Sequence, residues 1–399
     1  MPNNTLSRAD LRSEGIVYDI HYGDVLIKFG SILDMGSEDV PYIANGKEGK
    51  TSAQLQDGDI VIADTAEDET AGKAVEIYNA QRKRIEAGLH TIPCRPISTY
   101  TPMYLGYYMN SAFYHSQLLS LLQGVKVLSI SKANISKTVI SLPQSKMEQE
   151  KISSVLYLID LKVKKQRQVI DTLKKYKRGL LNDMFPQKGA TIPKLRLAGF
   201  TGAWEQRKLG DTNTYFTDGN YGEAYPKPSD MTDKSVGVPF LTGGNLKDGR
   251  LDITDASYIT KEKHEKLTSG HLVEDDIVIA VRGSLGALGY VNKGNSGWNI
   301  NSQLAILRTD KTELSGEYLL QFLLSSNGQI ELVKRQTGSA LRQLPINAIK
   351  DVDIPITSIG EQFKIGVYFR NLDHLITLHQ HKLDLLMQHK AGVLQQLFI

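Results

Sequence analysis

Two stretches of 38 residues, Glu148–Phe185 and Glu361–Phe398, repeat one another and constrain the fold more than any other feature. They align without a gap at an offset of 213 residues, and eleven positions are identical, including a Glu-Gln start and a final Phe. Apolar residues recur at alternating steps of four and three, which is the a/d pattern of a coiled coil. A helix of this length spans roughly 57 Å at 1.5 Å per residue. The repeat predicts two long helices, which we expect to pair antiparallel within the chain.

The predicted helix seam has ten positions in each copy, and eight of them are apolar. The two polar positions coincide in the copies, at Gln166 and His379 and at Lys177 and Lys390, as expected of residues that fix the register of a helix pair. The alternative is two amphipathic helices that pack into separate cores. The apolar seam residues are Ile152, Leu156, Ile159, Val163, Ile170, Leu173, Leu180 and Met184 in the first copy, and Ile365, Phe369, Leu372, Ile376, Leu383, Leu386, Val393 and Leu397 in the second.

The residues before each long helix also repeat, which predicts a tandem duplication. Asp59–Ala63 reads DIVIA and is identical to Asp276–Ala280, and an acidic turn precedes both. β-Branched runs between Gly and Asp residues predict short strands, so the fold class is mixed, α/β or α+β. We predict a globular segment at 1–143, a long helix at 144–187, a second globular segment at 188–356 and a second long helix at 357–399.

Local patterns predict individual elements of the first globular segment. β-Branched runs favour strands at Asp24–Phe29 and Val40–Ile43, and helical spacing favours helices at Glu76–Glu86 and Met103–Leu122. The second globular segment opens with Ile192–Asp211, which has no counterpart before the first. We therefore expect the first segment to be shorter at its start.

Bulk composition sets broad limits on the protein. Its 399 residues suggest two to four domains, and the net charge of +3 argues only weakly for a polyanionic partner. The basic run Lys162–Arg178 is either a solvated helix face or a binding face. The single cysteine, Cys94, excludes an internal disulfide and a cysteine-based metal site. No signal peptide and no run of 18 apolar residues is present, so we expect a cytoplasmic protein without a membrane partner.

Residues Ala44–Thr51, ANGKEGKT, fit a permissive form of the phosphate-binding loop. Such a loop works because glycine amides surround phosphate oxygens and a helix begins at once. The following residues run directly into the predicted strand Asp59–Ala63 and leave no room for a useful helix. A Gly/Lys-rich loop near backbone phosphate is our preferred interpretation, and a nucleotide-binding enzyme is kept as an alternative.

Other patterns of catalysis and metal binding are missing from the sequence. Four histidines fall within the second long helix, at His374, His379, His381 and His389, but no HExxH occurs. No GxSxG motif and no GxGxxG after a strand are found. We predict neither a catalytic residue nor a metal ligand in this chain.

Polar and basic loop residues at strand ends suggest a DNA-binding surface. Arg and Lys suit guanine and phosphate, and Asn and Gln can pair with adenine through two hydrogen bonds. Solvated loops are the alternative interpretation for each residue taken singly. The candidate DNA-binding residues are Lys28, Asn45, Lys47 and Lys50 in the first globular segment, and Thr242, Gly243, Asn245, Arg282, Ser284, Asn301, Ser302, Gln303, Arg335 and Arg342 in the second.

These features together resemble the specificity (S) subunit of a type I restriction–modification enzyme. The resemblance covers nearly the whole chain. It rests on Ile192–Asp211, on the paired strands DGDIVIA and EDDIVIA, on Gly338–Pro355 and on the Glu-Gln starts of both long helices. It implies that each globular segment is a target recognition domain for one half of a bipartite, asymmetric DNA site, and that the helices are spacers.

The same resemblance implies the partners. Two modification subunits would bind S-adenosylmethionine and methylate adenine N6, and restriction subunits would use ATP and Mg²⁺. The chain itself would bind no cofactor and catalyse no reaction. Family members usually carry a segment like Ile192–Asp211 before the first recognition domain, so we expect that domain to lack its usual N-terminal segment. A coiled-coil interaction protein without a DNA role is the second alternative.

Overall fold

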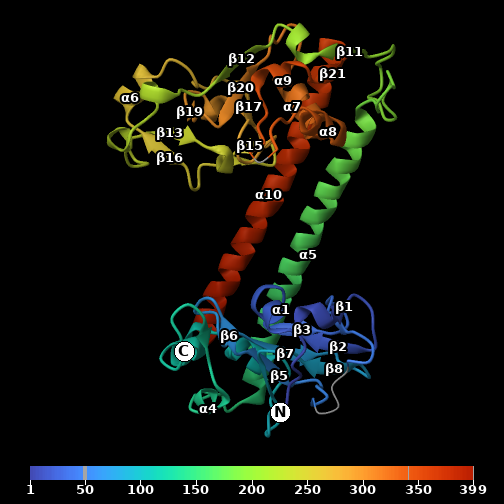
Figure 1. Cartoon of the computed structure of the whole chain (residues 1–399). Helices are drawn as coiled ribbons and strands as arrows, with labels where there is room; N and C mark the ends of the chain where they lie inside the picture. Colours follow the sequence, from blue (N-terminus) through green and yellow to red (C-terminus); the bar gives the residue numbers. More distant parts are fainter. Residues whose placement is uncertain (48–51, 340, 399) are drawn as a thin grey trace. The chain divides into compact units, whose positions relative to one another are not determined.

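The chain folds into two compact units that share the two long helices. A computed structural model describes residues 1–47, 52–339 and 341–398. Unit 1 comprises Met1–Gln168 with His381–Ile399, and unit 2 comprises Val169–Gln380. The long helices α5 (Lys146–Met184) and α10 (Ile359–Leu397) each contribute to both units (Figure 1). Among the described residues, no helix is long and apolar enough to cross a membrane.

Unit 1 is built on two four-stranded sheets with short helices around them. One sheet has the order β1-β4-β2-β8 and the other β3-β7-β5-β9, and β6 pairs with β10. The strands are β1 (Leu11–Arg12), β2 (Val17–Ile20), β3 (Ile32–Asp34), β4 (Tyr42–Ile43), β5 (Ile60–Ala63), β6 (Thr65–Ala66), β7 (Ala74–Tyr78), β8 (Arg84–Ala87), β9 (Thr91–Cys94) and β10 (Leu128–Ser129). The helices are α1 (Tyr22–Ile27), α2 (Tyr104–Tyr108), α3 (Ala112–Leu119) and α4 (Lys132–Ile135).

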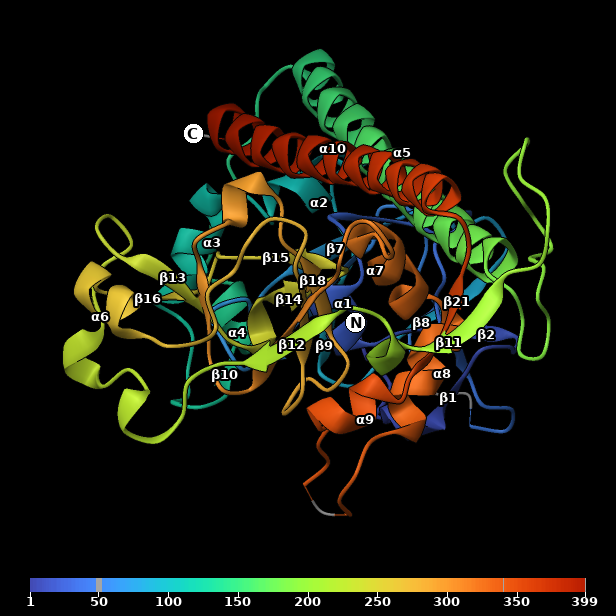
Figure 2. The same cartoon turned by 90° about the horizontal axis from the view of Figure 1, so that it is seen from above.

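Unit 2 has a four-stranded sheet of order β12-β20-β17-β18 and a smaller sheet β16-β13-β19, with α6 beside it (Figure 2). Two further strand pairs are β14-β15 and β11-β21. The strands are β11 (Glu205–Lys208), β12 (Tyr215–Asp218), β13 (Val238–Leu241), β14 (Leu246–Lys247), β15 (Arg250–Leu251), β16 (Ser257–Ile259), β17 (Ile277–Ala280), β18 (Leu288–Tyr290), β19 (Asn299–Ile300), β20 (Leu304–Arg308) and β21 (Asp353–Ile356). The helices are α6 (Lys261–Lys266), α7 (Gly316–Leu324), α8 (Ser326–Lys334) and α9 (Ile346–Lys350).

The duplication extends to an ion pair with a buried aspartate in each unit. The DIVIA strands β5 and β17 each lie between two antiparallel neighbours. At the start of β5, the Asp59 carboxylate accepts hydrogen bonds from Nε and Nη2 of Arg95 at 2.8 and 2.6 Å. At the start of β17, Asp276 accepts the same two bonds from Arg308 at 2.7 and 2.8 Å. Both carboxylates are buried, so this shared aspartate holds the central strand in place in both units.

Two predicted elements of unit 1 are wrong. Asp24–Phe29 is not a strand, because the His21 ring accepts a hydrogen bond from the Gly23 amide at 3.2 Å and starts helix α1. Glu76–Glu86 is not a helix. Asn79 and Gln81 have φ angles of +58° and +52°, which turn the chain between strands β7 and β8.

Two other predictions are right in part. Met103–Leu122 is helical, but the chain breaks between α2 and α3, where the Ser111 hydroxyl accepts a hydrogen bond from the Tyr114 amide and caps the second helix. The strand predicted at Val40–Ile43 is present only as Tyr42–Ile43. A local side-chain cap therefore decides the boundary between α2 and α3.

The apolar residues of the long helices contribute to the core of each unit. In unit 1, Ile152 and Leu156 of α5 join a core cluster with Tyr104 and with Phe398, which follows α10. In unit 2, Ile365, Phe369, Leu372 and Ile376 of α10 join a cluster with Tyr318 and with Phe185, which follows α5. Of the fourteen seam residues other than Met184 and Leu397, ten are buried and four are half-buried. The seam thus attaches each helix to a globular core as well as to the other helix.

One ion pair between the long helices occurs once in each unit. In unit 2, Nζ of Lys177 donates to both carboxylate oxygens of Asp373 at 2.8 Å. In unit 1, Nζ of Lys390 lies 2.5 Å from Asp160. Lys177 and Lys390 are equivalent in the repeat, as are Asp160 and Asp373, so the two pairs are reciprocal. All four side chains are at most 26% exposed, and a slipped register would leave partly buried charges unpaired.

The Lys177–Asp373 pair can be tested by exchanging its charges. The substitution Asp373→Lys places two ammonium groups opposite each other and should lower the unfolding free energy by about 1–3 kcal/mol, between the values for exposed and buried pairs. The double variant Lys177→Asp/Asp373→Lys should recover most of that loss in thermal denaturation followed by circular dichroism. Lys175→Asp, an exposed charge reversal on the same helix, is the matched control. Equal losses in the single and double variants would contradict the pairing.

A buried carboxyl group in unit 1 makes its stability depend on pH. Burial, together with the nearby Glu86 carboxylate, raises the pKa of Asp19 from 3.8 to about 7, although Asn4 donates a hydrogen bond to it. The native state therefore retains a proton that the unfolded chain releases. Its contribution to stability is complete below pH 3.8 and is lost as pH rises through 7.

We expect the melting temperature of the wild-type chain to fall between pH 5 and pH 8.5, and Asp19→Asn to reduce that slope. Burial also raises the pKa of Glu76 to about 7. Glu76 therefore accounts for any pH dependence of the melting temperature that remains in the Asp19→Asn variant. Asp39→Asn, at an exposed aspartate, should leave the slope unchanged. A wild-type melting temperature that rises over this interval would contradict the assignment.

Candidate nucleic-acid interface

Three loops of unit 2 meet where the strands β13, β17 and β19 end. The amides of Val281 and Arg282 both donate to the carbonyl of Gln303, at 2.9 and 3.2 Å. The Asn301 amide donates to the Leu241 carbonyl at 2.8 Å, and the loop that follows Leu241 brings Gly243 against Ser284. We call this the loop surface and define it as Tyr221, Thr242, Gly243, Arg282, Ser284, Ser302 and Gln303.

Arg282 is held by neutral groups of the loop surface. Its Nη1 donates to the Tyr221 hydroxyl at 3.2 Å and to the Ser302 carbonyl at 3.0 Å, and its guanidinium lies 5.5 Å from the centre of the Tyr221 ring. The Tyr221 hydroxyl itself donates to Ser302 at 3.0 Å. Burial, and then the nearby Asp218, raise the pKa of Tyr221, so the hydroxyl remains a donor at neutral pH.

The charge of Arg282 is available to a ligand. Arg308, by contrast, is committed to the carboxylate of Asp276, whereas no carboxylate in the described part of the chain forms a salt bridge with Arg282. Arginine recognises phosphate and the O6 and N7 atoms of guanine through paired hydrogen bonds. A fixed arginine without an acidic partner has the chemistry for either contact.

Gln303 combines a fixed backbone with an exposed side chain. Its amide donates to Oδ1 of Asn301 at 3.0 Å, and its carbonyl accepts from Val281 and Arg282. The side chain is exposed beside Arg282. A glutamine amide can bond adenine through its N6 and N7 atoms, so the loop surface presents one side chain suited to each purine.

Three other predicted residues have structural contacts. Oδ1 of Asn245 accepts from the Thr242 amide and hydroxyl at 2.8 and 3.1 Å, and the Asn245 side chain is buried. Asn301 is also buried and orders Gln303. Arg335 pairs with Glu331 and with Asp353. In this structure, these side chains shape the loops rather than face outward.

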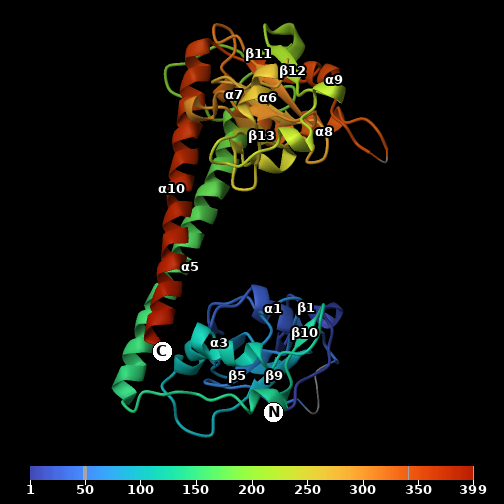
Figure 3. The same ribbon diagram turned by 90° about the vertical axis from the view of Figure 1, so that its left-hand side faces the viewer.

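Arg342 is exposed in the segment between α8 and α9, two helices that lie close together in Figure 3. Thr337 and Gln343 exchange two backbone hydrogen bonds of 2.8 and 2.9 Å within this segment. The Leu344 amide then donates to the Val281 carbonyl at 3.0 Å, which attaches the segment beside the strand end that carries Arg282. Unit 2 thus brings most of its predicted residues to one region, with Arg335 beside β21 instead.

The predicted residues of unit 1 do not form a comparable cluster. Nζ of Lys28 pairs with Asp39 at 3.0 Å, and Lys47 pairs with Asp10. The hydrogen bond from Lys47 lowers the pKa of Asp10 to about 2, so this carboxylate stays charged. Asn45 is exposed in the turn after β4, and Lys50 lies outside the described residues.

Two other features of unit 1 were considered as sites. The phosphate-loop alternative at Ala44–Thr51 receives no support, because residues 52–59, which the structure describes, contain no helix. The loop after β6 is acidic, with Glu67, Asp68 and Glu69 exposed, whereas the residues that follow β17 in unit 2 include Arg282. An acidic loop repels phosphate, so this loop of unit 1 lacks the cationic group that Arg282 provides in unit 2.

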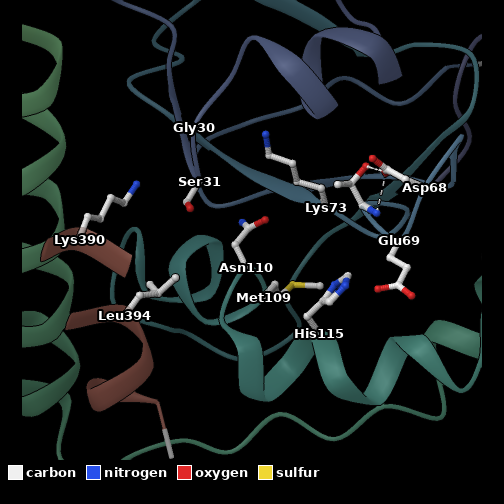
Figure 4. Close-up of a pocket in the computed structure, with 11 residues that line it drawn as sticks. Gly30, Ser31, Asp68, Glu69, Lys73, Met109, Asn110, His115, Lys390 and Leu394 are labelled. Atoms are coloured by element: carbon white, nitrogen blue, oxygen red, sulfur yellow. Dashed lines mark hydrogen bonds between the residues drawn. The ribbon is translucent and has the colours of Figure 1, made fainter. Parts of the chain in front are cut away.

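A cavity of about 700 Å³ lies in unit 1 beside this acidic loop (Figure 4). Three of the polar side chains in its lining, Lys73, Asn110 and Lys390, have internal partners. Nζ of Lys73 donates to the carbonyls of Leu26 and Phe29 at 2.7 and 3.1 Å, and the Asn110 amide bonds the backbone of Ala74. Lys390, also in the lining, pairs with Asp160. Both lysines of the lining are therefore already engaged within the protein.

Sequence reasoning missed Tyr221, which positions Arg282. The available signal was an aromatic residue between Gly219 and Gly222 directly after a strand. Gly222 has a φ angle of +59°, and a Cβ at Gly219 would lie 2.3 Å from the Asn301 carbonyl oxygen. Both glycines allow the backbone path that brings Tyr221 over Arg282.

Comparison with known proteins relates the chain to restriction–modification systems. Residues 202–388, which include the whole loop surface, match the family model of the type I restriction modification DNA specificity domain. The putative type I restriction enzyme MjaX specificity subunit of Methanocaldococcus jannaschii is 26% identical over 200 residues, 49% of this chain and 45% of that protein. The StySPI specificity subunit of Salmonella potsdam is 23% identical over 327 residues, 79% of this chain and 68% of that protein. The chain thus spans about half to two thirds of these relatives.

A solved structure shares the fold. The type I restriction–modification S subunit from M. genitalium covers 100% of this chain and 93% of its own, with a TM-score of 0.56 and 14% identity. This likeness confirms the predicted fold class, in which two globular regions are combined with two long helices.

The loop surface can be tested through Arg282 and Gln303. Arg282→Ala or Gln303→Ala should weaken binding to a cognate duplex by about 1–3 kcal/mol and relax the sequence preference of one half-site only, because each removes a base contact. The measurement is fluorescence anisotropy with duplexes varied at each position, at fixed salt. Arg370→Ala, at an exposed arginine of α10, is the control. Equal weakening on all sequences would show phosphate contacts instead, and unchanged binding would exclude both residues from the interface.

Proposed function

Because residues 202–388 match the family model of the type I restriction modification DNA specificity domain and the chain is similar to specificity subunits of such enzymes, we propose that it is the DNA-reading subunit of such a complex. The globular parts of the two units, residues 1–143 and 188–356, are target recognition domains, each of which reads one half of a bipartite DNA site. The observation that carries the proposal is the loop surface of unit 2. There, Arg282 has no acidic partner in the described part of the chain, and Gln303 is exposed beside it.

The partners supply the chemistry in this proposal. Two modification subunits bind S-adenosylmethionine and methylate adenine N6, and restriction subunits use ATP and Mg²⁺ to cleave DNA. The chain itself binds DNA and these subunits but catalyses no reaction. The exposed basic residues of Lys162–Arg178 on α5 are a surface for the partner subunits or for the DNA backbone.

The long helices act as the spacer between the half-sites. Each is continuous over 39 residues, about 58 Å at 1.5 Å per residue, and each belongs to both units. The reciprocal pairs Lys177–Asp373 and Lys390–Asp160 support this role, because they fix the register of α5 against α10 within each unit.

The central experiment maps N6-methyladenine across the genome of cells that carry the modification subunits, with and without this chain. Methylation at a bipartite motif that depends on the chain would support the proposal. Methylation that is the same without the chain would contradict it.

The spacer role has a separate test in the same cells. Removing one heptad from each helix, Val163–Val169 and Ile376–Lys382, retains both reciprocal ion pairs and removes about 10 Å of each helix. We expect a shorter unspecified spacer between unchanged half-sites. Removing the heptad from α5 alone should abolish methylation, because the two ion pairs can no longer form together. A changed half-site with the original spacer would exclude the spacer role.

A further inference from the structure

In unit 2, the segment that contains strand β11 covers the edge of strand β21. Strand β21 pairs antiparallel with β11 in a register from Glu205–Ile356 to Lys208–Asp353. The Leu209 amide extends this ladder to the Val352 carbonyl at 2.8 Å. Under this cover, Val352 and Ile354 are fully buried.

An arginine attaches the same segment to the start of α10. Nε and Nη2 of Arg196 donate to the two carboxylate oxygens of Glu361, both at 2.8 Å, and Glu361 is fully buried. Nη2 of Arg196 also donates to the Thr201 carbonyl at 3.2 Å, which orders the turn before β11. The covering segment of unit 2 is therefore a strand preceded, nine residues earlier, by an arginine.

Unit 1 has the corresponding edge without a strand on it. Alignment on the prolines that close both segments, Pro143 and Pro355, places Val139–Leu142 opposite Asp351–Ile354. The Val139 amide donates to the Gln117 side chain at 2.8 Å, and the Ser141 amide donates to the Tyr108 hydroxyl at 2.8 Å. The backbone amides of alternate residues thus form hydrogen bonds on one side of the segment. This is the pattern of an extended segment, whose backbone groups point alternately to opposite sides.

The other side of this segment is open. Among the described residues, no backbone group pairs with Ile140 or Leu142. Their side chains are 37% and 39% exposed, and Val139 is 65% exposed, whereas their counterparts Val352 and Ile354 are fully buried. An unpaired edge flanked by exposed apolar side chains is the surface to which an added strand binds.

The glutamate that binds the arginine in unit 2 also has a counterpart in unit 1, and that counterpart forms no ion pair with the described residues. This counterpart of Glu361 is Glu148, which is exposed. Burial first, and then Tyr108 and the Glu148 carboxylate, raise the pKa of Tyr104 to about 12. Glu361 likewise contributes to the raised pKa of the corresponding Tyr318. The charges of Glu148 and Glu361 thus act on equivalent tyrosines of the two units.

We propose that Val139–Glu148 of unit 1 is a docking edge for a segment of another polypeptide of the same type as Ile192–Lys208. The segment adds a strand to the open side of Val139–Leu142, and its arginine pairs with Glu148. Tyr104 and Phe398 are already buried within unit 1, so no aromatic residue of the docking segment is needed to cover them. The docking segment is therefore recognised through its strand and its arginine, and not through a counterpart of Trp204.

A peptide with the sequence of residues 190–211 tests this proposal on the full-length protein without DNA. We expect saturable one-site binding of the fluorescein-labelled peptide, measured by anisotropy, that weakens with added salt. Arg196→Glu in the peptide, or Glu148→Arg in the protein, should lower affinity by about tenfold or more, because each places like charges together. Combining the two changes should restore binding. Glu150→Arg, at an exposed neighbour of Glu148, is the matched control.

A photo-crosslinker at the peptide position of Arg207 locates the site. Crosslinks to Val139–Leu142, identified by mass spectrometry, would support the docking edge. Crosslinks to β21 would show that the peptide replaces the covering segment of unit 2 and would overturn the proposal. Absence of binding, or binding that Glu148→Arg leaves unchanged, would also overturn it. None of these outcomes depends on whether the chain reads DNA.

Discussion

The fold depends on an ion pair between the two long helices, in which a partly buried lysine requires an aspartate as its partner. Lys177 meets Asp373 in unit 2, and Lys390 meets Asp160 in unit 1. Each aspartate has a second donor from its own unit, Gln321 for Asp373 and Tyr107 for Asp160. An apolar seam alone tolerates a slip by one heptad, but a partly buried charge does not. The two ion pairs therefore join the position of each helix to the position of the globular core beside it.

The duplicated framework carries loops of opposite character. The DIVIA strand and the pairing of its buried aspartate with an arginine are retained in both units, but the residues that follow include the basic Arg282 in unit 2 and, after β6, the acidic Glu67 to Glu69 in unit 1. Because the framework positions the loops without depending on their sequence, loops can change while the core stays the same. Two units with different loops are suited to reading an asymmetric site.

Structure was predicted correctly from the sequence where a pattern extends over many residues. It was predicted incorrectly where a single side chain determines the local structure. The two long helices and the DIVIA strands follow from periodicity over many residues. The strand predicted at Asp24–Phe29 failed because the His21 ring caps a helix there. Asn245 and Arg335 looked like ligands of DNA, and only the tertiary structure shows their internal partners. The role of Tyr221 depends on a contact with Arg282, 61 residues away in the chain, which no local pattern reveals.

The two phenylalanines that end the repeats make the cores of the two units form at different stages of synthesis. Phe185 packs against Trp204, Tyr318 and Phe322, and all of unit 2 comes from one continuous stretch, Val169–Gln380. Phe398 packs against Tyr104 and Tyr108 of unit 1, although nearly 300 residues separate them. On the ribosome, where folding follows the order of translation, unit 1 can close its core only after Phe398 has emerged, although most of its residues are made before those of unit 2.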